Sequence, residues 1–321
     1  MLNAHVVEEF DDRALALLRE NLTAAVRLSH GAEVPADTHI LISGRPTREQ
    51  LATCPDIRAV IVPWAGVPEN TRELVHDFPN ISIHNLHHNA AATAEMALAL
   101  LMSVAKFIVP LDRKLRANDW TPRYAPSRAI GLNGKTVLII GYGQIGQRVG
   151  CVCRALGMNV IATRRNRVEQ DAFAEVRAIS DLPQLLPRAE VIIITAPLTP
   201  ETRGLIGEKE LAALPRDAVL INVGRGAIVD ESALYNALKN GQLAAAGLDV
   251  WYNYPADEAS RTNTPPSQYP FGELDNVVLT PHCGGDEKDI DVARMRDLAG
   301  MLNAAARGEE MPNRVDVGAG Y

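Results

Sequence analysis

One short segment limits the possible folds of this chain more than any other feature. Residues 136–140 (Thr-Val-Leu-Ile-Ile) have the composition of a buried β-strand, and a helical pattern covers residues 144–156. Between them the chain reads Gly141, Tyr142, Gly143, Gln144, Ile145 and Gly146. Glycines permit a tight turn there, and the first N–H groups of the helix can hold a pyrophosphate. The segment therefore predicts a dinucleotide site in a parallel α/β sheet.

Strand patterns alternate with helical patterns along most of the chain. A first series has strand candidates at residues 39–43, 58–62 and 81–84. A second series has at least six, at residues 135–140, 159–163, 190–195, 218–223, 244–250 and 276–280. Such alternation is typical of doubly wound parallel sheets, which bind ligands beyond the carboxyl ends of their strands. We expect an α/β protein with two doubly wound parallel-sheet domains, a Rossmann dinucleotide domain and a flavodoxin-like substrate domain, with a cleft between them.

The length of 321 residues also favours two domains, because it exceeds what one hydrophobic core usually serves. Residues 91–116 predict one long helix that joins the two series, and residues 120–133 predict an irregular arm. The last helical pattern, about residues 286–307, follows the second series and can fold back on the first body. The expected division is residues 1–98 plus 286–321 for the substrate-binding domain and residues 99–285 for the dinucleotide-binding domain.

Composition narrows the possible partners. The net charge of -7 disfavours nucleic acid or an anionic membrane surface as the main partner. The longest strongly apolar stretch, residues 96–105, is too short to cross a bilayer, and the start of the chain does not read as a signal peptide, so we expect a cytoplasmic protein. The four cysteines lack Cys-x-x-Cys spacing, and no metal site is predicted.

The end of the strand after the glycine turn bears on which dinucleotide is bound. An NAD site usually has an acidic residue there, whereas arginine accommodates the 2′-phosphate of NADP. Here the strand ends in Thr163, Arg164 and Arg165. NADP is therefore the expected cofactor and NAD the alternative, with a solvated basic loop as the other interpretation of the two arginines.

Four further motifs follow the glycine turn in order. They are residues 196–202 (Ala-Pro-Leu-Thr-Pro-Glu-Thr), 222–226 (Asn-Val-Gly-Arg-Gly), 247–251 (Gly-Leu-Asp-Val-Trp) and 279–285 (Leu-Thr-Pro-His-Cys-Gly-Gly). Together with the glycine turn, they resemble the D-isomer-specific 2-hydroxyacid dehydrogenase family, closely over residues 136–285 and in outline elsewhere. The resemblance implies an NAD(P)-dependent oxidoreductase of small 2-oxo acids or D-2-hydroxy acids, such as glyoxylate or hydroxypyruvate.

Arg225 and His282 fit the chemistry that the resemblance implies. Reducing a 2-oxo acid requires a cation that holds the carboxylate and polarises the ketone, and a proton donor for the developing alkoxide. Arginine matches a carboxylate bidentately, and histidine titrates near neutrality. Both residues lie just past strand ends, where a doubly wound sheet binds ligands.

The resemblance also assigns cofactor and substrate contacts. It places Asp249 at the nicotinamide carboxamide and the backbone near Ala65 and Gly66 at the substrate carboxylate, while Asn89 stands six residues before Glu95, as in the family's cleft motif. Trp64 is a candidate pocket wall. The expected cofactor contacts are Gly141, Tyr142, Gly143, Gln144, Ile145, Gly146, Arg164, Arg165, Ala196, Pro197, Val223, Asp249 and Gly284, and the expected substrate contacts are Trp64, Ala65, Gly66, Asn89 and Arg225.

One position departs from the family pattern. Family members usually carry Glu, and formate dehydrogenases Gln, five residues after the Asp of the Asp-Val-Trp motif, where it hydrogen-bonds the catalytic histidine. Here that residue is Tyr254. Tyr254 is therefore the candidate partner of His282, with Asp257 and Glu258 as alternatives.

Two other functions stay open from the sequence. The first is a nucleotide-sensing binding protein, like the transcriptional corepressors that share this fold. The second is a formate- or phosphite-type dehydrogenase, although the missing formate-type Gln weakens the formate version. The resemblance also suggests a homodimer built through the dinucleotide domains and the arm of residues 120–133.

Overall fold

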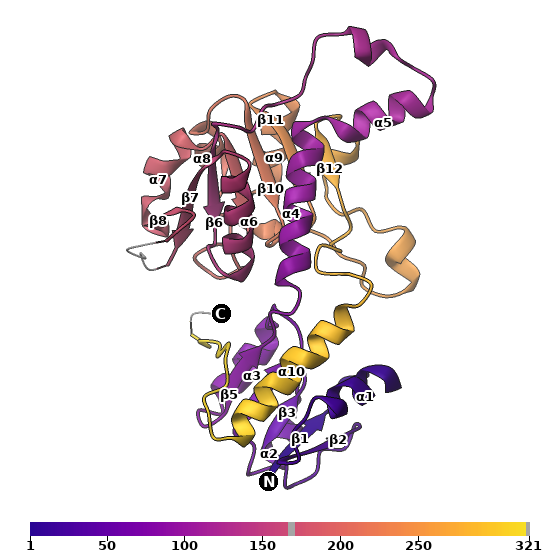
Figure 1. Ribbon diagram of the computed structural model, residues 1–321, viewed down its shortest axis with the longest axis vertical. Coiled ribbons are helices and arrows are strands. Elements are labelled where there is room, and N and C mark those ends of the chain that lie inside the picture. Colours follow the sequence, from indigo (N-terminus) through magenta and orange to yellow (C-terminus); the bar gives the residue numbers. More distant parts are fainter. Residues whose placement is uncertain (166–170, 319–321) are drawn as a thin grey trace. The chain divides into compact units, whose positions relative to one another are not determined.

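A computed structural model describes residues 1–165 and 171–318, and the chain divides into two compact units (Figure 1). The first unit is Met1–Asn89 with Asp286–Tyr321, and the second is Ala90–Gly285. The boundary proposed from sequence, between residues 98 and 99, falls inside helix α4 (Ala90–Ala105). All of α4 belongs to the second unit.

The first unit is built on five parallel strands. They are β1 (Leu2–Val6), β2 (Val26–His30), β3 (Ile40–Ile42), β4 (Ala59–Val62) and β5 (Ser82–Asn85). Their order, β2-β1-β3-β4-β5, is that of flavodoxin-like sheets, as expected. The sequence patterns missed β1 and β2, because β1 includes the polar Asn3 and His5 and β2 is only partly buried. His5 is buried because its two ring nitrogens pair with the Ser29 hydroxyl and the Gly31 carbonyl.

Helices cover both faces of this sheet. Ile40, Ile42 and their neighbours pack under α1 (Asp12–Glu20) and α10 (Ile290–Ala306), which lie side by side (Figure 1). Leu41, Val60 and Val62 face the other way, towards α2 (Arg48–Ala52) and α3 (Glu69–His76). Because successive strand residues point to opposite faces, fully apolar strands such as β3 need cover on both sides.

The second unit has a seven-stranded parallel sheet. Its strands are β6 (Thr136–Ile140), β7 (Asn159–Arg164), β8 (Glu175–Ala178), β9 (Val191–Ile194), β10 (Ala218–Asn222), β11 (Leu243–Leu248) and β12 (Val277–Leu279). The order is β12-β11-β10-β9-β6-β7-β8. The chain adds β7 and β8 on one side of β6 and β9 to β12 on the other, so the strand order reverses between the neighbours β6 and β9. This is the Rossmann arrangement, and ligands bind outside the carboxyl ends of the strands at such a switch point. The sequence missed β8, in which only Val176 is buried.

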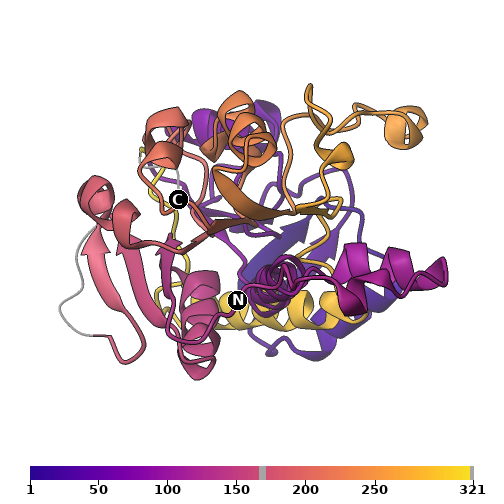
Figure 2. The ribbon, with the colours of Figure 1, turned by 90° about the horizontal axis from the view of Figure 1, so that it is seen from above.

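The helices of the second unit also lie on both faces of the sheet. Ile139 and Ile193 pack towards α4 and α6 (Gln144–Ala155), whereas Leu138 and Ile192 pack towards α7 (Leu182–Leu185), α8 (Glu208–Ala212) and α9 (Glu231–Lys239). Figure 2 shows α9, in orange, and α6, in magenta, on opposite sides of the strands. Short 3₁₀ turns occur at η1 (Thr121–Tyr124), η2 (Ile179–Asp181), η3 (Leu186–Arg188), η4 (Gly226–Ile228), η5 (Ala259–Thr262) and η6 (Phe271–Glu273).

The expected long helix over residues 91–116 is wrong. The structure has α4 and then α5 (Ile108–Arg116), joined at Phe107, whose φ is 57°, with a bend of 64° between them (Figure 1). Pro110 explains the break, because its ring would clash with the Lys106 carbonyl and it has no N–H to donate. Within residues 1–165 and 171–318, no single helix is long and apolar enough to cross a membrane, although the bent pair α4 and α5 passes the same test together.

Candidate active site

The glycine turn lies between β6 and α6 and depends on its glycines for close packing. Gly141 has a φ of 99°, and a Cβ there would lie 2.5 Å from the backbone nitrogen of Ala196. A Cβ on Gly146 would lie 2.3 Å from the Gly141 carbonyl oxygen. Gly143 precedes the first turn of α6, and no described atom beyond its chain neighbours lies within 4 Å of the position a Cβ would take. The turn thus leaves open space at a helix N-terminus, which suits a pyrophosphate.

Tyr142 fills a different role from its glycine neighbours. Its side chain is buried in the core, and its hydroxyl donates to the Asp171 carboxylate at 2.8 Å. Burial, reinforced by this hydrogen bond, raises the pKa of the phenol. The backbone N–H groups of Gly141 and Tyr142 donate to the Thr163 carbonyl, which ties the turn to the end of β7. Tyr142 therefore anchors the turn.

The two arginines at the end of β7 differ in their surroundings. Arg164 is half-buried, donates from Nε to the Tyr142 carbonyl, and holds its guanidinium carbon 5.7 Å from the centre of the Tyr142 ring. Arg165 is exposed, and its charge adds to a Thr199 hydrogen bond in lowering the pKa of Glu201. Arg164 thus lies at the edge of the glycine turn.

The end of β9 lies next to this turn in the sheet, and the end of β10 lies one strand further along. Ala196 follows β9 and contacts Gly141, while a Cβ on Gly224 would lie 2.7 Å from the Ala196 carbonyl oxygen. Val223 is buried and Pro197 is exposed. These predicted cofactor residues therefore share the carboxyl edge of the sheet with the glycine turn.

Arg225 is held by a braced loop after β10. The Asn222 side chain accepts from the Gly224 N–H at 3.0 Å and donates to the Arg225 carbonyl at 3.0 Å. The Arg225 guanidinium donates to the Gly224 carbonyl at 2.7 Å, and the side chain is half-buried. Asn222 thus fixes the backbone that presents the guanidinium.

His282 and Tyr254 face one another beyond β11 and β12. Their ring centres are 5.4 Å apart and their planes are tilted by 55°. The Tyr254 hydroxyl accepts from the Trp251 N–H at 3.1 Å. Burial raises the pKa of Tyr254, with the Trp251 hydrogen bond and the Arg225 charge acting in the opposite direction. The phenol is therefore neutral near pH 7, and its ring packs beside the imidazole.

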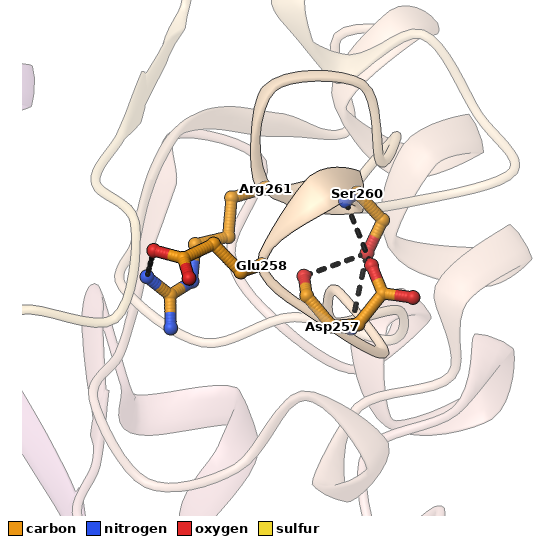
Figure 3. A network of polar contacts seen from close by, with 4 residues as sticks. All are labelled: Asp257, Glu258, Ser260 and Arg261. Atoms are coloured by element: carbon orange, nitrogen blue, oxygen red, sulfur yellow. Dashed lines mark hydrogen bonds and ion pairs between the residues drawn. The ribbon is translucent and has the colours of Figure 1, made fainter.

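The alternative partners of His282 are engaged within their own loop (Figure 3). The Asp257 carboxylate accepts from the Ser260 N–H at 2.9 Å, and the Ser260 hydroxyl donates to the Asp257 carbonyl at 2.9 Å. Glu258 pairs with Arg261 at 3.0 Å. These bonds form a local turn around η5, so Tyr254 remains the candidate partner.

Asp249 contacts Gly284, which lies two residues after His282. Asp249 is buried, and its carboxylate accepts from the Gly284 N–H at 2.8 Å. A Cβ on Gly284 would lie 2.6 Å from the same carboxylate oxygen. The Asp249 carboxylate thus binds the turn that carries His282, a contact that the sequence did not suggest.

The remaining predicted residues belong to the first unit. Trp64, Ala65 and Gly66 follow β4, and Asn89 ends the first segment of this unit. The Trp64 ring occupies the space beside Gly44, where a Cβ would lie 1.9 Å from the indole. The Asn85 side chain donates to the Ala65 carbonyl at 2.5 Å and so fixes the loop. Trp64 therefore packs against its own unit, and Asn85 is a bracing residue that the sequence patterns did not identify.

The polar residues that brace the site were harder to find from sequence than the site itself. Asn222 lies inside a recognised motif, which is a signal that could have identified it. Asp171 and Asn85 lie outside those motifs. Within residues 1–165 and 171–318, no group of three or more His, Cys, Asp or Glu residues could hold a metal ion.

Comparisons with known proteins give a consistent result. A family model described as D-isomer specific 2-hydroxyacid dehydrogenase, NAD binding domain, matches residues 98–284, more than half of the chain. A glyoxylate reductase of Aeropyrum pernix is 37% identical over 233 residues, which cover 70% of this chain and 66% of that protein. A D-3-phosphoglycerate dehydrogenase of Methanocaldococcus jannaschii is 30% identical over 284 residues, which cover 88% of this chain and 52% of that protein. The chain thus spans between half and two thirds of the length of these relatives.

Solved structures share the fold along the whole chain. A D-isomer specific 2-hydroxyacid dehydrogenase from Xanthobacter autotrophicus, solved with NADPH and MES, has a TM-score of 0.81 and 26% sequence identity, with 99% of each chain covered.

Proposed function

The chain belongs to the family of D-isomer specific 2-hydroxyacid dehydrogenases, and from this premise we propose that it is an NAD(P)-dependent oxidoreductase. Its proposed substrates are small 2-oxo acids of the glyoxylate or hydroxypyruvate kind, reduced to 2-hydroxy acids that have the D configuration where C2 is a stereocentre. The observation that supports this best is the arrangement in the second unit. Arg225, Tyr254 and His282 follow three neighbouring strands at the same sheet edge as the glycine turn.

The chemistry divides between the cofactor and the side chains. The nicotinamide, when bound, supplies or takes up the hydride. In this proposal the Arg225 guanidinium binds the substrate carboxylate and polarises the adjacent ketone, because its fork matches a carboxylate and its charge stabilises a developing oxyanion. His282 donates a proton to that oxygen and takes one from the hydroxy acid in the reverse direction. The backbone near Ala65 and Gly66 and the side chain of Asn89 stay predicted substrate contacts.

A substrate panel tests this function. The full chain is mixed with NADPH or NADH and with glyoxylate, hydroxypyruvate or pyruvate, and absorbance at the nicotinamide band is followed. We expect oxidation with at least one 2-oxo acid. Cofactor binding without turnover on the whole panel would favour the nucleotide-sensing alternative, and turnover with formate or phosphite alone would favour the other dehydrogenase class.

We expect Arg164 and Arg165 to select NADPH over NADH. A charge-assisted hydrogen bond to a phosphate contributes about 1.5–3 kcal/mol, which corresponds to roughly a tenfold to hundredfold preference. Arg164→Ala and Arg165→Ala should therefore raise the Kd of NADPH and leave that of NADH unchanged, as measured by fluorescence titration.

Arg154→Ala is the matched control. Arg154 is exposed near the end of α6, and its substitution removes one positive charge from the same unit. It should change neither Kd. An equal loss of NADPH and NADH affinity in Arg164→Ala would indicate that Arg164 supports the glycine turn through Tyr142 and does not recognise the phosphate.

Tyr254 should affect how activity depends on pH. Tyr254→Phe keeps the ring beside His282 and removes only the acceptor of the Trp251 N–H, so kcat should fall a few-fold, on the order of one lost hydrogen bond.

Tyr254→Glu places a carboxylate near the imidazole and should keep it protonated to higher pH. Since reduction uses protonated His282, the loss of reductive activity should then move to higher pH. A pH–rate profile of Tyr254→Glu that matches the wild type would remove Tyr254 as the partner.

We also propose a cytoplasmic homodimer. Residues Ile108, Leu111 and Leu115 of α5 are exposed and apolar, as are Trp120 and Tyr124 in the following arm. A second copy of the chain would bury these exposed apolar side chains. Sedimentation equilibrium of the purified chain tests this, and a monomer at micromolar concentration would contradict it.

A further inference from the structure

We propose that Thr280 is a positioning residue, which acts through Asp249 to hold the turn that carries His282. This inference rests on the proposed function, in which His282 is the proton donor, and it adds a residue that positions His282. The geometry of the turn itself is independent of any activity.

The Asp249 carboxylate accepts hydrogen bonds from residues that precede and follow His282 in the sequence. The Thr280 hydroxyl donates to Asp249 Oδ1 at 2.6 Å, two residues before the histidine. The Cys283 N–H donates to the same oxygen at 3.1 Å, and the Gly284 N–H donates to Oδ2 at 2.8 Å. Asp249 is 1% exposed, so these bonds form out of contact with water. Both carboxylate oxygens are thus committed to the segment of residues 280–284.

A second set of bonds fixes Thr280. Its N–H donates to the Leu248 carbonyl at 2.9 Å, which continues the pairing of β11 and β12. Its carbonyl accepts from the indole Nε1 of Trp251 at 2.8 Å. Thr280 is therefore held by its backbone as well as its hydroxyl, and it can transmit the position of β11 to the turn.

The backbone of His282 needs such support. Its φ is 58°, in the left-handed region that non-glycine residues rarely adopt. Its side chain is exposed, so burial in a core does not hold it. A residue in this conformation persists only where its surroundings determine it. Loss of one bond of the Asp249 set should let the turn relax and move the imidazole.

The sharpest test observes the imidazole directly. The full chain is labelled with ¹³C at histidine Cε1, and the His282 resonance is assigned by its loss in His282→Gln. Thr280→Val keeps the shape of the side chain and removes the hydroxyl, so the His282 resonance should shift or broaden while the other histidines keep theirs. Thr280→Ser restores the donor and should restore the wild-type resonance. Thr53→Val is the control, because the Thr53 hydroxyl donates to the Glu49 carbonyl of its own helix in the first unit and otherwise contacts the adjacent Cys54.

Activity provides the second readout. Thr280→Val should lower kcat about tenfold, equivalent to about 1.4 kcal/mol, with an unchanged KM because Arg225 is untouched. A wild-type His282 resonance in folded Thr280→Val overturns the inference even if the enzyme reduces 2-oxo acids. A shifted resonance in a chain that reduces none supports the inference and contradicts the proposed function instead. If circular dichroism shows that Thr280→Val is unfolded, Asp249→Asn takes its place with the same expected shift.

Discussion

His282→Ala should lower kcat by about 10²–10⁴-fold, the usual cost of a lost general acid, with little change in the KM of the 2-oxo acid. The reason is that the imidazole acts in the transition state, when the alkoxide needs its proton. Arg225→Ala should raise KM and lower kcat together, because the guanidinium both binds the carboxylate and polarises the ketone. Steady-state kinetics with saturating NADPH measures both effects.

The two variants also provide controls for each other. NADPH affinity should survive in both, since neither side chain belongs to the glycine turn. Arg203→Ala removes an exposed arginine of the same unit and should leave kcat and KM unchanged. Wild-type turnover in His282→Ala would exclude this residue as the proton donor, and a change confined to KM in Arg225→Ala would leave it only a binding role.

Alanine substitutions at Gly143 and Gly146 should separate cofactor binding from folding. A Cβ on Gly146 would lie 2.3 Å from the Gly141 carbonyl oxygen, so the backbone must shift, at a cost of about 1–3 kcal/mol or more. Gly146→Ala should therefore lower both thermal stability and NADPH affinity. At Gly143 the Cβ would meet no described atom beyond its chain neighbours within 4 Å. Gly143→Ala should keep the wild-type Tm and still weaken NADPH binding at least about tenfold, because the new methyl group occupies the space proposed for the pyrophosphate.

Gly272→Ala is the control for both glycines. Its Cβ would likewise meet no described atom beyond its chain neighbours within 4 Å, but it lies in η6 and not in the glycine turn. Its Tm and NADPH affinity should both match the wild type. Unchanged NADPH affinity in Gly143→Ala would place the dinucleotide elsewhere.

Much of the fold was predictable because its strands are strongly apolar. β9 is Val-Ile-Ile-Ile and is buried throughout, so its position follows from composition alone. β1 was missed because the polar Asn3 and His5 interrupt its apolar residues, and β8 was missed because only Val176 is buried in this edge strand. Pro110 is a sequence signal for the break between α4 and α5. The break was missed because the helical pattern continues on both sides of it.

Less of the site was predictable. The motifs identified Arg225 and His282, whose chemistry belongs to their side-chain types. The braces of the site depend on which polar groups come within hydrogen-bond distance after folding. Asp249 and Thr280 are 31 residues apart, so residue spacing does not predict their bond. The bond from the Gly224 N–H to the Asn222 side chain is local, but it depends on the conformation of the loop after β10. Asp257 and Glu258 bond to residues of their own loop. These bonds depend on the backbone conformation of that loop, which the residue pattern does not specify.

The central claim is hydride transfer from the nicotinamide to the carbonyl carbon of a 2-oxo acid. The most direct measurement uses NADPH deuterated at C4, on each face in turn, with glyoxylate, hydroxypyruvate and pyruvate, and mass spectrometry of the product acid. We predict that one of the two deuterated cofactors transfers deuterium to C2 of the hydroxy acid, and that His282→Ala forms this labelled product about 10²–10⁴-fold more slowly. NADPH that is bound but transfers no deuterium to any of the three acids would contradict the account.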